Sequence, residues 1–161
     1  MDAAERLKFF LEEIGKLIFD KSYAPIIIRI EEKCHSSTII ASYDRYTKMR
    51  DRQLVEEGFT IYKLVCNRYG RQDSKLVNYA AHEVRHQLQH HHKQTVNLSL
   101  WHKIKRFPLK IWGPILRLLL SRIFVDLSNK EERDAYLIGY LAEKDYKKYQ
   151  NLKRIAEIVR I

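Results

Sequence analysis

A chain of 161 residues is long enough for one hydrophobic core, so we expect residues 1–161 to form a single domain. Hydrophobic residues make up 45% of the sequence, with 5 glycines and 3 prolines, which excludes collagen-like and disordered proteins. Charged residues make up 31%, which excludes a multispan membrane protein. The formal net charge of +10 keeps nucleic acid or an anionic surface as a candidate partner.

Cysteine usage and the first residues indicate where the protein works. Cys34 and Cys66 form no CxxC pair, so a disulfide scaffold or a cysteine-rich metal site is excluded. Asp2 and Glu5 stand where a secretory signal needs a basic start and an apolar run. We therefore expect no signal peptide and a cytoplasmic location.

The first part of the chain predicts a helix followed by a small sheet. Residues 3–19 repeat apolar side chains with the spacing of an amphipathic helix. Three runs rich in Ile, Val, Thr and Tyr, at 24–30, 37–43 and 59–69, are typical of strands, and we expect a sheet of two to four strands. The charged stretch 44–58 predicts a loop or a short helix.

The second part of the chain is predicted to be helical. Ser74 is placed to cap a helix over 75–93, whose core stripe is Leu76, Val77, Ala80, Ala81, Val84 and Leu88. Shorter helices are expected at 98–106 and 114–125, and the SNKE sequence at 128–131 has the form of a capping box that starts a long final helix. Lys110, Arg117 and Arg122 interrupt the most apolar stretch, so we predict no transmembrane segment.

The sequence HEVRH at 82–86 carries the strongest chemical signal. His82 and His86 lie one helical turn apart, so both imidazoles can bind a single tetrahedral ion. In a catalytic zinc site, the metal lowers the pKa of a bound water toward ~7 and a neighbouring carboxylate takes its proton. The pattern therefore predicts His82 and His86 as zinc ligands and Glu83 as the general base. The alternative without a metal is a solvated, His-rich helix face.

A candidate third ligand follows about fifty residues later. The sequence AAHEVRHQLQ at 80–89, together with EERDAYLIGYLA at 131–142, resembles the gluzincin metallopeptidases, especially small members with a downstream ExxA or ExDA helix. The resemblance implies that Glu132 is the third zinc ligand. It also implies that Asp134 hydrogen-bonds a ligand histidine and fixes its ring. The alternative is that Glu132 is only a carboxylate at a helix start.

His92 is a rival third ligand, ten residues after His82, as in metzincins and Spartan-like DNA-associated zincins. The metzincin version fails because Gln89 replaces the turn glycine and no methionine follows residue 49. The Spartan-like version would suit the basic charge. A helix that continues past Leu88, however, rotates His92 out of register with His82, so we favour Glu132.

The same helix resembles a second, unrelated class. Arg85 and His90 form an RX4H arrangement similar to that of HEPN ribonucleases, which act on RNA phosphodiesters. HEPN domains are helical bundles, and that fold gives no role to Glu83 or Glu132. The bland interpretation of Arg85 is an exposed side chain that pairs with a local carboxylate, and we interpret His90 and His91 as solvated.

These patterns together predict an α+β zincin-like fold and a zinc metallopeptidase that acts on a peptide or protein. We expect an edge strand, with FTIYKLV at 59–65 as the candidate, to align the extended substrate. Tyr79, Tyr136 or Tyr140 could stabilise an oxyanion, although core packing is the simpler role. The alternatives are a DNA-associated zincin that uses the basic segment 103–110 to bind nucleic acid, an RNA-cutting HEPN-like protein, and a non-catalytic zinc-stabilised binding module.

Overall fold

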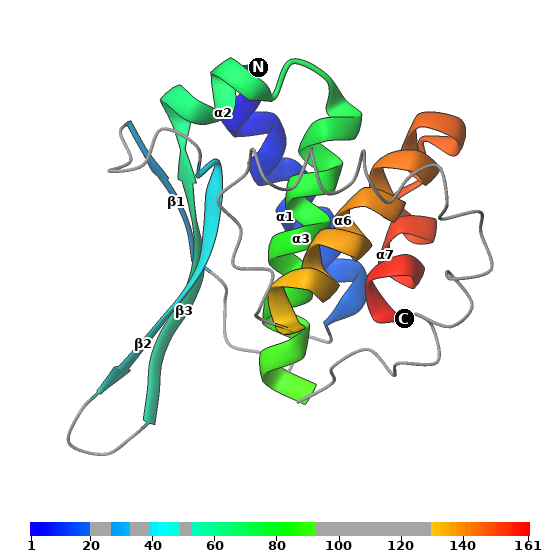
Figure 1. Cartoon of the computed structure of the whole chain (residues 1–161). Helices are drawn as coiled ribbons and strands as arrows, with labels where there is room; N and C mark the ends of the chain where they lie inside the picture. Colours follow the sequence, from blue (N-terminus) through cyan, green and yellow to red (C-terminus); the bar gives the residue numbers. More distant parts are fainter. Residues whose placement is uncertain (20–26, 33–38, 49–52, 93–129) are drawn as a thin grey trace.

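The computed structural model describes residues 1–19, 27–32, 39–48, 53–92 and 130–161. Within these ranges the protein has an α+β fold with five helices and a small mixed sheet of three strands (Figure 1). The elements in chain order are α1 (Ala3–Ile18), β1 (Ile27–Glu31), β2 (Ala41–Lys48), β3 (Gln53–Tyr62), α2 (Lys63–Tyr69), α3 (Asp73–His92), α6 (Lys130–Tyr149) and α7 (Leu152–Arg160). The predicted helices at 98–106 and 114–125, the serine of the capping box and the basic segment 103–110 lie outside the described residues.

The N-terminal helix α1 has the predicted position. The Asp2 carboxylate accepts a hydrogen bond from the Glu5 backbone N–H at 2.9 Å, which satisfies one of the free donors at the helix start. The apolar stripe that includes Leu7, Leu11 and Ile14 is buried, and it packs the helix against α3. The periodicity was sufficient to predict this helix because a single face is apolar.

The sheet has the strand order β1-β3-β2, with β1 parallel and β2 antiparallel to β3. This confirms the expected sheet of two to four strands. The prediction of a loop or short helix over 44–58 is wrong, because most of it lies in the long pairing of β2 with β3, out to Lys48 and Gln53. Ladder hydrogen bonds form between backbone groups, so a charged stretch can pair as well as an apolar one.

The third predicted strand ends earlier than its composition suggests. Beyond Tyr62 the described residues offer no further strand to pair with, because β1 ends at Glu31 and the Tyr62 backbone N–H already donates to the Ile40 carbonyl at 2.9 Å. The chain therefore satisfies its own backbone groups as helix α2, which buries Val65 and Cys66. The strand predicted over 59–69 is a strand only as far as Tyr62.

Helix α3 occupies the centre of the molecule and contacts α1, α6, α7 and β2 (Figure 1). The whole predicted core stripe of this helix is buried. Ser74 does not cap the helix as predicted, because the Gln72 carbonyl accepts from the Lys75 and Leu76 N–H groups and Ser74 is buried within the first turn. The start therefore lies slightly earlier than expected, and the helix runs without interruption to His92.

The C-terminal part is two helices rather than the single long one predicted. Gln150 has a φ of 48° and interrupts the helix, and Asn151 then caps α7 by accepting from the Lys153 N–H at 3.0 Å. Helices α3 and α6 approach closely at Gly139, where a Cβ atom would lie 2.9 Å from the backbone carbonyl oxygen of Asn78. Only glycine permits this spacing. Among the helices described, none combines the length and the apolar character needed to cross a membrane.

Candidate metal centre

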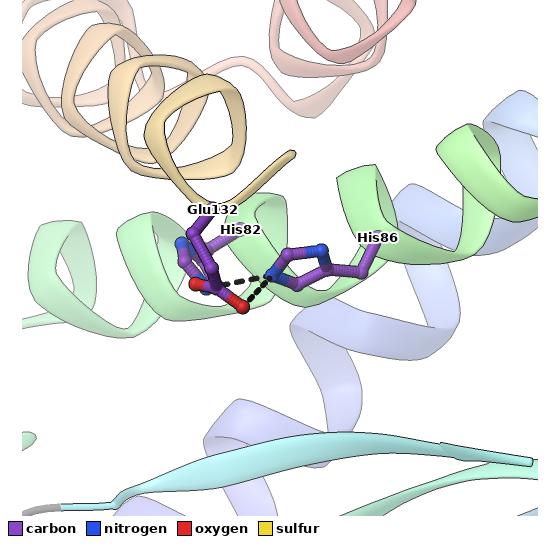
Figure 2. A group of neighbouring side chains, drawn as sticks. All are labelled: His82, His86 and Glu132. Carbon is purple, nitrogen blue, oxygen red and sulfur yellow. Dashed lines mark hydrogen bonds and ion pairs between the residues drawn. The ribbon is translucent and has the colours of Figure 1, made fainter. Parts of the chain in front are cut away.

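Two helices bring three potential metal ligands together. His82 and His86 project from α3, one turn apart, toward Glu132 in the first turn of α6 (Figure 2). The two histidine Nε2 atoms are 3.1 Å apart. Glu132 places one carboxylate oxygen 3.2 Å from His86 Nε2 and the other 3.7 Å from His82 Nε2. Within the described residues, this is the group of histidine, cysteine and acidic side chains close enough to hold a metal ion.

The donor set has the spacing and the chemistry of a metal site. Ligand atoms at ~2.0–2.1 Å from a tetrahedral ion are about 3.3 Å from one another. The 3.1 Å between the two histidine nitrogens and the 3.2 Å between His86 Nε2 and one Glu132 oxygen lie close to that value. Two imidazole nitrogens and one carboxylate oxygen also form a ligand set of catalytic zinc sites, in which three protein ligands leave one position open.

The environment favours the ligating state of His82. Burial lowers the pKa of His82 to about 3, and the proximity of His86 acts in the same direction. This ring is therefore neutral near pH 7, as metal binding requires. Burial also lowers the pKa of His86, but the hydrogen bond to Glu132 and the charge of Glu83 outweigh it and raise the pKa above its ordinary value.

Glu83 lies beside the three ligands without joining them. Its Oε1 is 3.9 Å from His82 Nε2, and the residue is 8% exposed. Burial raises the pKa of Glu83 to about 8, while His86 and a hydrogen bond from the backbone of Tyr43 on β2 act against the rise. A carboxylate with a pKa near neutrality suits proton exchange at neutral pH. The site therefore combines three potential metal ligands and one adjacent carboxylate.

Asp134 does not make the hydrogen bond that the sequence predicted. Within the described residues, its Oδ2 accepts from Arg85 Nε and from Gln89 Nε2, both at 2.7 Å, rather than from a ligand histidine. The reason is that Gln89 lies between them: its Oε1 is 3.0 Å from His86 Nδ1. Asp134 is thus connected to His86 through Gln89, a residue that the sequence analysis considered only as a departure from the metzincin pattern.

The residues of the ribonuclease alternative do not form a common site. Arg85 is 1% exposed, and its guanidinium donates to Asp134 and, at 2.6 Å, to the Val159 carbonyl. His90, in contrast, is exposed. The sequence also suggested an exposed Arg85 that pairs with a local carboxylate. Both parts are wrong, because Arg85 is buried and its carboxylate partner lies 49 positions away. A buried guanidinium whose Nε and Nη1 already donate to Asp134 and Val159 is not placed to bind an RNA phosphate, and a helical bundle contains no mixed sheet.

The other histidines of α3 lie away from the centre. Because the helix is continuous to its last residue, His92, the backbone of His92 lies about 15 Å along the axis from His82. His91 is not solvated as predicted: its Nε2 lies 2.8 and 2.7 Å from the two carboxylate oxygens of the buried Glu57 on β3. This pair connects the end of α3 to the sheet.

Of the three tyrosines considered, Tyr136 lies nearest the ligands. Its ring contacts His82 edge to face, with 4.5 Å between ring centroids. Burial raises the pKa of Tyr136 to about 12, and the charges of Glu132 and Glu83 add to the rise. Its hydroxyl therefore keeps its proton and remains a donor at neutral pH. Tyr140 is 43% exposed, and Tyr79 packs against the core.

Comparison with models of known protein families, with curated proteins and with solved structures gives no match to this chain.

Proposed function

We propose that this protein is a zinc-dependent metallopeptidase with a zincin-like fold, in which His82, His86 and Glu132 hold the metal. The observation that carries the proposal is the convergence of three ligand atoms within 4.8 Å of one another, with Glu83 alongside. The two helices that supply them resemble the paired motif helices of gluzincins in sequence. The spatial convergence is an argument independent of that resemblance, because residues 46 positions apart need not meet.

The roles of the residues follow from their positions. A zinc ion at this centre would supply a water of lowered pKa and polarise a peptide carbonyl. Glu83 accepts a proton from the attacking water and transfers it to the leaving amine, because it lies next to the ligands and its pKa is close to neutrality. Tyr136 donates a hydrogen bond from its hydroxyl toward negative charge that develops beside His82.

The substrate would align along β2 rather than along the strand named from the sequence. The sequence FTIY belongs to β3, which is the central strand and is paired on both sides, so it offers no free edge. Strand β2 is an edge strand, contacts α3, and approaches Glu83 through the backbone of Tyr43. An extended peptide that pairs with β2 would pass beside the general base.

The test combines metal analysis with turnover of fluorescein-labelled casein, an unstructured protein substrate. We expect one zinc per chain, and we expect Glu83→Gln to retain zinc while cleavage falls by about 100-fold or more. The matched control is His90→Ala, which changes an exposed histidine of the same helix and should alter neither quantity. A chain that binds no zinc would refute the proposal. Zinc bound without cleavage of casein or of a peptide library would favour a zinc-stabilised binding module instead.

A further inference from the structure

Gln89 has no part in the proposed reaction, yet it is one of the most fully engaged side chains near the site. It is 6% exposed and lies on α3 three residues after His86. Its Nε2 donates to the Glu131 carbonyl at 3.0 Å and to Asp134 Oδ2 at 2.7 Å. Its Oε1 lies 3.0 Å from His86 Nδ1. All hydrogen-bonding ends of this amide therefore have a partner.

The partners determine which way the amide points. A backbone carbonyl only accepts hydrogen bonds, and so does the Asp134 carboxylate, which forms a buried ion pair with Arg85. The amide nitrogen of Gln89 must face these two acceptors, so its oxygen must face His86. An oxygen acceptor 3.0 Å from Nδ1 requires a hydrogen on that nitrogen. Nε2, which faces Glu132 at 3.2 Å, is then the nitrogen left to bind a metal.

A second buried glutamine on the same helix shows that burial alone does not explain these contacts. Gln87 is 0% exposed, and its amide nitrogen and oxygen both have no hydrogen-bond partner within the part of the chain that the structure describes. Gln89, two residues later, has three. The difference lies in the α6 residues that face Gln89, and it makes Gln87 a matched control.

We propose that Gln89 is a positioning residue for His86: it keeps the hydrogen on Nδ1 and so directs Nε2 toward the metal. This inference rests on the metal centre proposed above. Partners of this kind orient ligand histidines in metal sites and fix which nitrogen binds. The chain of contacts also extends to α7, because Arg85 holds Asp134 and donates to the Val159 carbonyl. Helix α7 is thereby connected to His86 through Arg85, Asp134 and Gln89.

The first test measures zinc affinity by competition with a chromophoric chelator. In Gln89→Met the new side chain has a similar length and no polar group to bury, but it cannot accept a hydrogen bond from His86. We therefore expect zinc to bind about 10- to 100-fold more weakly. Gln87→Met should bind zinc as the unmodified chain does, because it removes an amide without partners. Melting temperatures of the metal-free variants show whether either substitution unfolds the protein. Affinity within about twofold of the unmodified chain for a folded Gln89→Met would overturn the positioning role.

The second test is the ring state of His86 in the metal-free protein, read from its nitrogen-15 chemical shifts. We expect a hydrogen on Nδ1 in the unmodified chain and in Gln87→Met. In Gln89→Met, Nδ1 should lose its hydrogen, and the ring should keep only the hydrogen on Nε2, which Glu132 accepts. An unmodified chain whose Nδ1 carries no hydrogen would overturn the inference, even if Gln89→Met does not fold. Absence of zinc binding by the unmodified chain refutes the metal centre, whereas the ring state still decides the role of Gln89.

Discussion

Replacing Arg85 with Met should destabilise the protein strongly, although Arg85 lies on the helix surface in the sequence pattern. The guanidinium is 1% exposed and donates to Asp134, which is 4% exposed, and to the Val159 carbonyl. Arg85→Met would leave that carboxylate in the interior with Gln89 as its remaining donor. Removing one partner of a buried ion pair costs about 3–5 kcal/mol, because the other charge stays desolvated.

That loss is a large part of the ~5–15 kcal/mol that stabilises a folded domain. For a chain of this size it corresponds to a fall in melting temperature of about 6–20 °C. The free energy of unfolding is measured by urea titration monitored by circular dichroism. Adding Asp134→Leu to Arg85→Met should recover part of the loss, because it removes the unpaired charge.

The control for this prediction is an exposed ion pair of the same type. Arg154 binds both carboxylate oxygens of Asp145, at 2.9 and 2.7 Å, but its side chain is 47% exposed. Arg154→Met should therefore lower the free energy of unfolding far less than Arg85→Met does. If Arg85→Met costs as little as Arg154→Met, the guanidinium is not buried as described, and the argument against an RNA-binding role for Arg85 fails with it.

Three further predictions concern the metal, pH and thiol chemistry. Glu132→Ala should weaken zinc binding by more than the ~10- to 100-fold typical of losing a residue that only hydrogen-bonds a ligand, whereas His92→Ala should not change it. The reverse result in a chelator competition would support the Spartan-like ligand set. Glu143→Gln should lower the free energy of unfolding at pH 7 by on the order of 1 kcal/mol. Burial raises the pKa of Glu143, but hydrogen bonds from Lys147, Asn78 and Lys75 outweigh it and lower the pKa below its ordinary 4.5. The stabilisation is thus present above pH 4.5 and is lost as the pH falls through the lowered pKa. The difference in unfolding free energy between Glu143→Gln and the unmodified chain, measured by urea unfolding, should shrink in that range. A difference independent of pH would contradict this. Burial raises the pKa of the Cys66 thiol to about 11, and Cys66 is 0% exposed, so in a Cys34→Ser variant iodoacetamide at pH 8 should modify it only as the protein unfolds. Rapid alkylation of the folded chain, seen by mass spectrometry, would show that Cys66 is accessible.

The sequence by itself determined the features that depend on short-range spacing. The amphipathic periodicity of α1 and the core stripe of α3 were predicted because neighbours on a helix face are three or four residues apart. The same rule placed His82 and His86 on one side of α3, with Glu83 next to them. Composition was also enough to predict a small sheet before this helix.

Only the tertiary structure decided which distant residues meet. It placed Glu132 against the two histidines, and it showed that β3 is the central strand, which no run of strand-forming residues can reveal. The roles of Arg85 and Gln89 depend on carboxylate and carbonyl partners contributed by α6 and α7. Local spacing sets the direction of a side chain from its own helix, whereas its partners come from the packing of helices that lie about fifty residues or more apart in sequence.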